Sequence, residues 1–128
     1  MTYESNRRVA QRYGDHVTWE DALALAQRLP GVEESTSYGT PAIKVRDKLM
    51  ARLRSEAEGG LVVMCGADEK AALLASGDPA FSTTPHYDGH GSIIVDLERV
   101  DPEHLAELLA DAWRAKAPKR LVAEFDAR

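Results

Sequence analysis

The chain has one cysteine, no long apolar run and no excess of positive charge, and each of these absences excludes a class of protein. One cysteine in 128 residues cannot form a disulfide framework within the chain or a Cys-x-x-Cys pair for structural zinc. No stretch approaches the roughly 20 apolar residues that a transmembrane helix needs. The formal net charge of −5 excludes a uniformly basic protein that coats nucleic acid.

The first fifteen residues are rich in charged side chains and lack the apolar run that a signal peptide needs. Together with the single free thiol, this favours a cytoplasmic location and no membrane partner. A chain of 128 residues is long enough to bury one core without disulfides or metal. We therefore expect a single domain over residues 1–128, with residues 1–16 as an N-terminal extension and residues 118–128 as a C-terminal tail.

Capping residues and the three-and-four spacing of apolar residues predict three helices. The first follows the N-cap Thr18 and is stopped by Leu29-Pro30-Gly31, because proline cannot continue the hydrogen-bond ladder. The second covers residues 68–75, with Asp68 as its cap. The third begins at Asp101-Pro102 and ends at Pro118, and the tail after it is expected to add a helical turn.

Short runs of β-branched and aromatic residues between turn residues predict two groups of strands. Four strands are expected over residues 32–38, 41–46, 48–54 and 60–65, and two more over 81–87 and 91–97. Asp88-Gly89 is expected to join the last two as a two-residue turn, because both residues tolerate positive φ. This order, α-β(4)-α-β(2)-α, predicts an α+β fold with helices packed on an antiparallel sheet.

A collinear series of motifs runs from the first predicted helix to the last: Trp19, Leu29-Pro30-Gly31-Val32-Glu33-Glu34-Ser35, Tyr38-Gly39-Thr40-Pro41-Ala42, Pro85-His86-Tyr87, and Ala112-Trp113-Arg114 to Ala117-Pro118. Over residues 17–120 this series resembles the MmcQ/YjbR family. The resemblance implies a two-layer α+β sandwich related to the secretion-chaperone and bacterial-frataxin (CyaY-like) architectures. It also implies two exposed hairpins, for which the family is described as a "double wing" DNA-binding fold, so DNA is the partner it suggests.

Five cations gather within eleven residues of the first predicted hairpin, interrupted by one acid, Asp47. Their alternation with apolar residues predicts that they share the solvent face of two adjacent strands, where they could neutralise phosphates. The alternative is a solvated sheet face whose charges discourage edge-to-edge aggregation. The five cations are Lys44, Arg46, Lys48, Arg52 and Arg54.

The negative charge of the chain is concentrated in its second half. Residues 66–111 carry two cations and ten acids, whereas residues 1–65 carry nine of each. Phosphate neutralisation supplies most of the non-specific affinity for nucleic acid, so the acidic segment would repel a duplex at the second predicted hairpin. Any DNA contact is therefore expected to be one-sided, at the first hairpin or the C-terminal tail.

The second predicted hairpin carries His86, Tyr87, Asp88 and His90 within five residues, which raises the question of a metal site. A two-residue turn would place the two histidines on opposite faces of the hairpin, and zinc needs three or four convergent ligands. We therefore predict no metal and no cofactor. His86 and Tyr87 are predicted to make structural hydrogen bonds at the base of the hairpin, with small-ligand binding as the alternative.

Spacing identifies no Ser/His/Asp or Cys/His set and no pair of carboxylates, so the sequence predicts a binding module rather than an enzyme. Cys65 ends an apolar run and is expected to be buried and inert. Trp19 and Trp113 are expected to belong to the core. Two functions stay open. One is nucleic-acid binding through the basic hairpin, and the other is a protein-interaction or small-molecule-binding domain that uses the groove beside the second hairpin.

Overall fold

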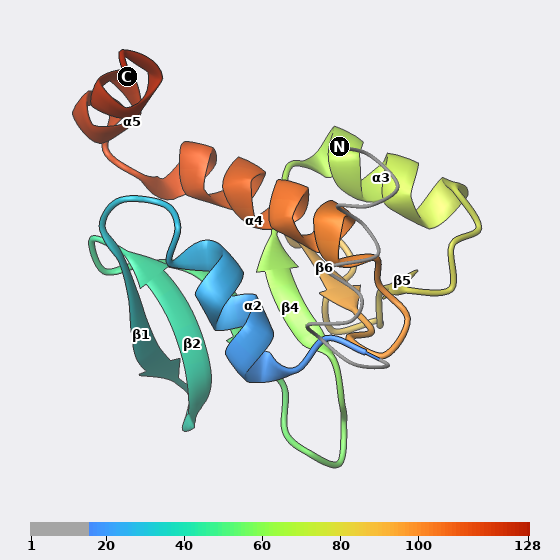
Figure 1. Ribbon diagram of the computed structural model, residues 1–128. Coiled ribbons are helices and arrows are strands. Elements are labelled where there is room, and N and C mark those ends of the chain that lie inside the picture. The colour runs from blue at the N-terminus through green and yellow to red at the C-terminus, as the bar shows by residue number, and fades with distance from the viewer. Residues whose placement is uncertain (1–15) are drawn as a thin grey trace.

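The computed structural model describes residues 16–128, which form six strands and four helices (Figure 1). Residues 1–15, most of the expected N-terminal extension, lie outside the described residues. The strands are β1 (Val32–Ser37), β2 (Thr40–Val45), β3 (Lys48–Leu53), β4 (Leu61–Met64), β5 (Phe81–Ser82) and β6 (Ser92–Val95). The helices are α2 (Trp19–Ala26), α3 (Ala67–Ala75), α4 (Pro102–Lys116) and α5 (Lys119–Asp126).

The strands make one antiparallel sheet in the order β1-β2-β3-β4-β6-β5. The expected α+β class and the order α-β(4)-α-β(2)-α are confirmed, and the C-terminal tail adds α5 as a fourth helix. Across residues 16–128, no helix combines the length and the apolar composition that crossing a bilayer requires.

Local capping chemistry sets the helix boundaries. The Thr18 hydroxyl accepts a hydrogen bond from the Asp21 N–H at 3.2 Å, and the Asp21 carboxylate accepts one from the Thr18 N–H at 3.0 Å. Helix α2 already ends at Ala26, because the next turn tightens to i→i+3 bonds before the proline. The predicted cap Asp68 is wrong: Gly66 is the N-cap of α3, and Asp68 lies in the first turn, where its charge favours the helix dipole.

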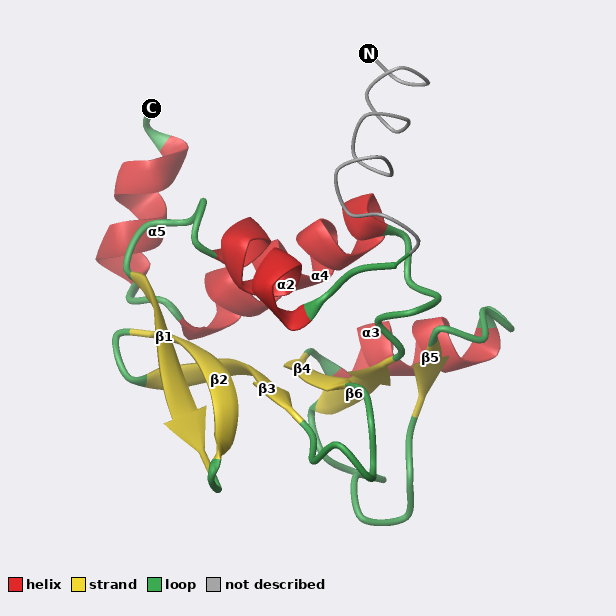
Figure 2. Ribbon diagram, turned by 60° about the horizontal axis from the view of Figure 1, so that its bottom comes forward, coloured by secondary structure: helices red, strands yellow, loops and turns green. Residues whose placement is uncertain are grey.

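Helices α2 and α4 lie over one face of the sheet, and loops rather than helices border the opposite face (Figure 2). We call this opposite face the open face because no helix lies over it, although its central residues Ala42, Val62 and Ile94 are buried. The core lies between the sheet and the two helices, where side chains such as Ile43, Leu61, Ile93 and Leu105 are fully buried.

Trp113 joins three parts of the fold and confirms the prediction that it is a core residue. The side chain is fully buried, and its indole N–H donates to the Pro30 carbonyl at 2.8 Å. Its ring meets the Phe125 ring of α5 edge-on, with 5.1 Å between centroids. Trp19 is half-buried and packs against the same core.

A β-bulge in β3 breaks the alternation that the sequence predicts. Ile43 pairs with Ala51, whereas the next residue of β2, Lys44, pairs with Leu49. Met50 is therefore the extra residue, and Met50 and Ala51 are both fully buried although they are neighbours. The extra residue shifts the alternation of β3 by one position. Before Met50 the even-numbered residues lie on the core side of the sheet, and after Met50 the odd-numbered residues do.

The prediction of a second hairpin over residues 81–97 is wrong for most of these residues. Strand β5 ends at Ser82, and residues 83–91, which we call the 83–91 loop, replace the two-residue turn. Pro85 has no N–H for a ladder, and the Thr84 carbonyl accepts hydrogen bonds from the N–H groups of Tyr87 and Asp88, both at 2.9 Å. These local turns replace the expected strand pairing, and β5 pairs with β6 over two residues.

Replacing Gly60 by alanine should destabilise the protein more than the same change at Gly59. Both glycines have positive φ, 89° and 75°. A Cβ at Gly60 would lie 3.0 Å from Ile94 Cγ2 and 3.3 Å from the Val95 carbonyl oxygen, whereas one at Gly59 has no neighbour within 4 Å. We expect losses of about 1 kcal/mol for Gly59→Ala and about 2–3 kcal/mol for Gly60→Ala in urea unfolding. Equal losses would show that the close approach of Gly60 to β6 contributes nothing.

Candidate functional site

One row of directly paired residues crosses the whole sheet on its open face. The strand register defines this row, because residues that pair directly on neighbouring strands point to the same side of a sheet. Its only charged member, an arginine, comes from β3 near the middle of the sheet. The row is Ser35, Ala42, Arg52, Val62, Ile94 and Ser82.

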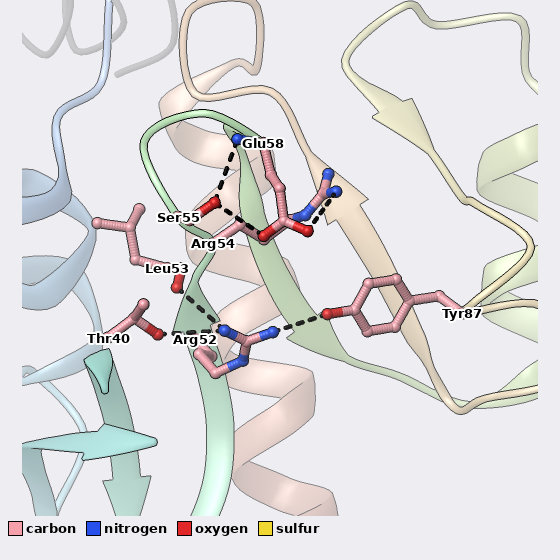
Figure 3. A network of polar contacts seen from close by, with 7 residues as sticks. All are labelled: Thr40, Arg52, Leu53, Arg54, Ser55, Glu58 and Tyr87. Carbon is pink, nitrogen blue, oxygen red and sulfur yellow. Dashed lines mark hydrogen bonds and ion pairs between the residues drawn. The ribbon is translucent and has the colours of Figure 1, made fainter. Parts of the chain in front are cut away.

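The guanidinium of Arg52 lies between β2 and the 83–91 loop and is held by neutral oxygen atoms (Figure 3). Nη2 donates to the Tyr87 hydroxyl at 2.7 Å, and Nη1 donates to Thr40 Oγ1 at 3.1 Å and to the Leu53 carbonyl at 3.5 Å. Within residues 16–128 Arg52 has no ion-pair partner. Its charge is therefore oriented by its neighbours but not neutralised by a contacting carboxylate, which leaves it available to an anion.

An exposed aromatic ring stands beside this guanidinium. Tyr38 lies in the β1–β2 turn with φ at 54°, followed by Gly39 at 80°, and the residue is 92% exposed. Arg52 Cζ is 5.6 Å from the centre of the Tyr38 ring, a distance typical of a cation–π contact. The ring is therefore held near the guanidinium and still open to a ligand.

Three further rings cluster in the 83–91 loop. The His86 ring packs edge-on against Tyr87 with 4.8 Å between centroids, and the His86 and His90 rings stack at 6.0 Å. The expectation that the two histidines face opposite sides is wrong, because the loop has replaced the two-residue turn that would have separated them. In the part of the chain that the structure describes, no group of three or more His, Cys, Asp or Glu residues could hold a metal ion.

Tyr87 contributes a hydrogen-bond donor to the site as well as an acceptor. Its hydroxyl oxygen accepts from Arg52, and its own O–H has no acceptor among residues 16–128. A ligand oxygen placed beside Arg52 would therefore meet donors from both side chains. The sequence singled out these two residues separately, and the fold brings them together.

The five cations of the predicted basic hairpin do not share one face. Lys44 and Arg52 belong to the open face, whereas Lys48 pairs with the core residue Val45 and so lies on the helix side. Arg46 lies in the β2–β3 turn, with φ at 48°, beside residues of α5. The cations are separated by the bulge at Met50 and by the β2–β3 turn at Arg46-Asp47, because strict alternation holds only in a regular ladder.

Arg54 follows Arg52 on the open face but is partly neutralised. Its Nη2 lies 3.6 Å from the Glu58 carboxylate, and the side chain is 14% exposed. The pKa of Glu58 is lowered by hydrogen bonds from the Ser55 side chain and backbone and by the charges of Arg54 and, more weakly, Arg52. Arg54 Nε is buried and has no hydrogen-bond partner within the described residues.

A groove of about 820 Å³ opens beside Arg54 and reaches the ends of β5 and β6. Ser82, Ile94, Asp96 and Leu97 of the predicted second hairpin line it, whereas His86 and Tyr87 do not. Its apolar walls include Trp19, Leu53 and Ile94. Its acidic side chains outnumber the basic ones and are Glu56, Glu58, Asp96 and Glu98.

A second cluster of titratable groups lies between α3 and α4, away from the open face. Burial, and then the neighbouring Asp111 carboxylate, raise the pKa of Glu69. Burial and the charge of Glu69 raise the pKa of the Cys65 thiol, which is half-buried rather than fully buried. A raised pKa keeps the thiol protonated, which disfavours a nucleophilic role.

Two residues that shape the site were not singled out by the sequence as site residues. Tyr38 was part of a family motif, and its only local signal was an aromatic residue before glycine in a turn. Lys70 of α3 is 8% exposed, and its Nζ donates to the Tyr87 carbonyl at 2.6 Å and the His90 carbonyl at 2.9 Å. No local signal distinguishes this lysine from a solvated helix residue.

Proteins similar to this chain include three mycobacterial relatives, one from Mycobacterium bovis and two from strains of Mycobacterium tuberculosis, each described as an uncharacterized protein. Each is 31% identical over 122 residues, and the match covers 84% of this chain and 95% of the relative. No solved structure matches the chain. The YjbR family model matches residues 27–115, which include every strand of the sheet, and the chain therefore belongs to the YjbR family.

Proposed function

We propose that the protein binds single-stranded nucleic acid on the open face of its sheet. The observation that carries the proposal is the Arg52 guanidinium, held by Tyr87 and Thr40 without an ion-pair partner in residues 16–128, beside the exposed ring of Tyr38. A guanidinium presents planar donors that match a phosphate. An exposed aromatic ring offers a surface on which a base can stack.

A single strand fits this surface better than a duplex does. Stacking on Tyr38 requires an unpaired base, because the bases of a duplex already stack on one another. The acidic segment 66–111 includes the 83–91 loop and would repel the second backbone of a duplex. The proposal keeps the one-sided contact that the charge distribution predicts and narrows it from the five cations of the first hairpin to the surroundings of Arg52.

The charge of the open face predicts a modest electrostatic contribution to binding. Lys44 and Arg52 have no ion-pair partner within the described residues, whereas Arg54 is paired with Glu58. Glu33 lies directly opposite Lys44 on β1 and offsets part of its charge. We therefore expect a weak salt dependence, equivalent to about two phosphate contacts.

Binding should be measured by fluorescence anisotropy with a labelled deoxythymidine strand of about 12 nucleotides at low salt. The single strand should bind more tightly than a duplex of the same length, and Tyr38→Ala should weaken it by about tenfold through the loss of stacking. Leu74→Ala is the matched control, because Leu74 is also a large exposed residue but lies on α3, away from the open face. This change should have no effect on binding. Tighter binding of the duplex, or an unchanged affinity in Tyr38→Ala, would contradict the proposal.

The acidic groove supports a second candidate function, the binding of a cationic peptide or small molecule. Its four carboxylates and apolar walls suit a ligand with a positive head and an apolar body. If the protein binds no oligonucleotide but binds an arginine-rich peptide, and Glu56→Gln with Glu98→Gln weakens that binding, the second function replaces the first.

A further inference from the structure

We propose that Lys70 is a positioning residue for the open face, because it holds the 83–91 loop so that the Tyr87 hydroxyl stays against Arg52. This inference rests on the proposed function, since the site it serves is the one formed by Arg52 and Tyr87. It assigns a role to a charged side chain that the fold buries.

Both hydrogen bonds of the Lys70 side chain are directed at the loop. Its Nζ donates to the carbonyl oxygens of Tyr87 and His90, residues 17 and 20 positions further along the chain. Lys70 forms no ion pair with a described residue. Burial of an ammonium group without a counter-charge is costly, and a methionine would fill the space without this cost. Packing alone therefore does not account for a lysine here.

Two contacts attach the loop backbone to the rest of the fold: the Gly91 carbonyl accepts from the Cys65 N–H at 2.9 Å, and Lys70 holds the segment 84–90. The other backbone hydrogen bonds of residues 84–90 are local and shape the turns, such as those from Tyr87 N–H to Thr84 and from His90 N–H to Tyr87. Among the described residues, Lys70 alone ties a main-chain group of this segment to a helix. Without it, the backbone of residues 84–90 keeps its turns and the bond at Gly91, and loses its connection to α3.

Tyr87 is consequently held at both ends by cations from different elements. Arg52 of β3 donates to its hydroxyl at 2.7 Å, and Lys70 of α3 donates to its carbonyl at 2.6 Å. The ring spans the two contacts, so a shift of the backbone would move the hydroxyl away from the guanidinium. Lys70 therefore controls the donor pair that would meet a phosphate, although it does not contact the ligand itself.

A double-mutant cycle tests this route of action. Lys70→Met and Tyr87→Phe should each weaken binding of the single-stranded oligonucleotide by about tenfold. If Lys70 acts through Tyr87, the double variant should bind no more weakly than Tyr87→Phe alone. Lys116→Met, an equal change of charge in the last turn of α4, is the control and should bind like the unmodified protein. Fully additive losses in the double variant would overturn the proposal.

Hydrogen exchange separates this inference from the proposed function. Amides of residues 84–90 should exchange faster in Lys70→Met than in the unmodified protein, whereas those of β2 and β3 should not change. If neither the unmodified protein nor its variants bind the oligonucleotide, the proposed function fails. The exchange result still decides the role of Lys70. Unchanged exchange over residues 84–90 would overturn that role. Lys70→Gln, which keeps two N–H donors on a shorter side chain, replaces Lys70→Met if the latter does not fold.

Discussion

Replacing Arg52 by glutamine should weaken the binding of a single-stranded oligonucleotide by about fiftyfold. The change removes the charge and the planar fork of donors, and charge-assisted hydrogen bonds contribute about 1.5–3 kcal/mol each. Arg52→Lys keeps the charge without the fork and should lose about tenfold. Anisotropy titrations at one salt concentration measure both effects, with urea unfolding to verify that the variants fold.

Arg46→Gln is the matched control for this prediction. It makes the same change of charge in the same hairpin, but Arg46 lies at the β2–β3 turn beside α5. We expect an affinity change of less than about twofold, since long-range charge effects at the surface are screened by salt. Equal losses at Arg46 and Arg52 would favour the whole basic hairpin as the contact surface and would contradict the assignment to the open face.

Replacing Trp113 by alanine should lower the free energy of unfolding by about 4 kcal/mol, the largest effect on stability that we expect. The side chain is fully buried, and the change would leave a large cavity between α4, the β1 end of the sheet and α5. Folded domains are stable by only about 5–15 kcal/mol, so this variant should be close to unfolding at 37 °C.

Trp113→Phe separates packing from hydrogen bonding at the same position. It keeps most of the ring but leaves the Pro30 carbonyl without the indole donor, which should cost about 1–2 kcal/mol. Urea unfolding followed by circular dichroism measures both variants. A loss below about 1 kcal/mol for Trp113→Ala would show that the contacts of this residue do not hold α4 to the sheet.

The parts of the fold that the sequence predicts correctly are those set by local chemistry. Thr18 and Asp101-Pro102 mark helix starts because their capping bonds involve residues two or three positions away. The first four strands follow from runs of β-branched residues between turns, and their pairing needs only short connections. The family resemblance over residues 17–120 is confirmed by the family model over residues 27–115.

The errors occur where a non-local contact decides the local structure. Met50 and Ala51 are both apolar, so the sequence alone does not show which of them breaks the alternation. Residues 81–87 have the β-branched and aromatic content of a strand, but Thr84 and Pro85 form turns. In addition, Lys70, 17 residues upstream, donates a hydrogen bond to the Tyr87 carbonyl. Neither the bulge at Met50 nor the hydrogen bond from Lys70 can be recognised from the residues next to it in the sequence.

The candidate site shows the same limit. Arg52 and Tyr87 were singled out from the sequence as members of two separate hypotheses, and a hydrogen bond between residues 35 positions apart unites them. Tyr38 lies beside Arg52, and Lys70 beside Tyr87, because of the strand register and the course of the 83–91 loop, which the sequence does not reveal. Conversely, Arg46 and Lys48 belonged to the predicted patch by spacing, and the turn and the bulge separate them from it.

The most direct test of the open-face site is a two-dimensional NMR titration of the ¹⁵N-labelled protein with the single-stranded oligonucleotide. The side-chain Nε–H signal of Arg52 and the amides of Tyr38, Thr40 and the 83–91 loop should shift together and saturate at one affinity. Shifts confined to Arg46, Lys48 and α5, or no shifts at all at low salt, would contradict the assignment of nucleic-acid binding to the open face.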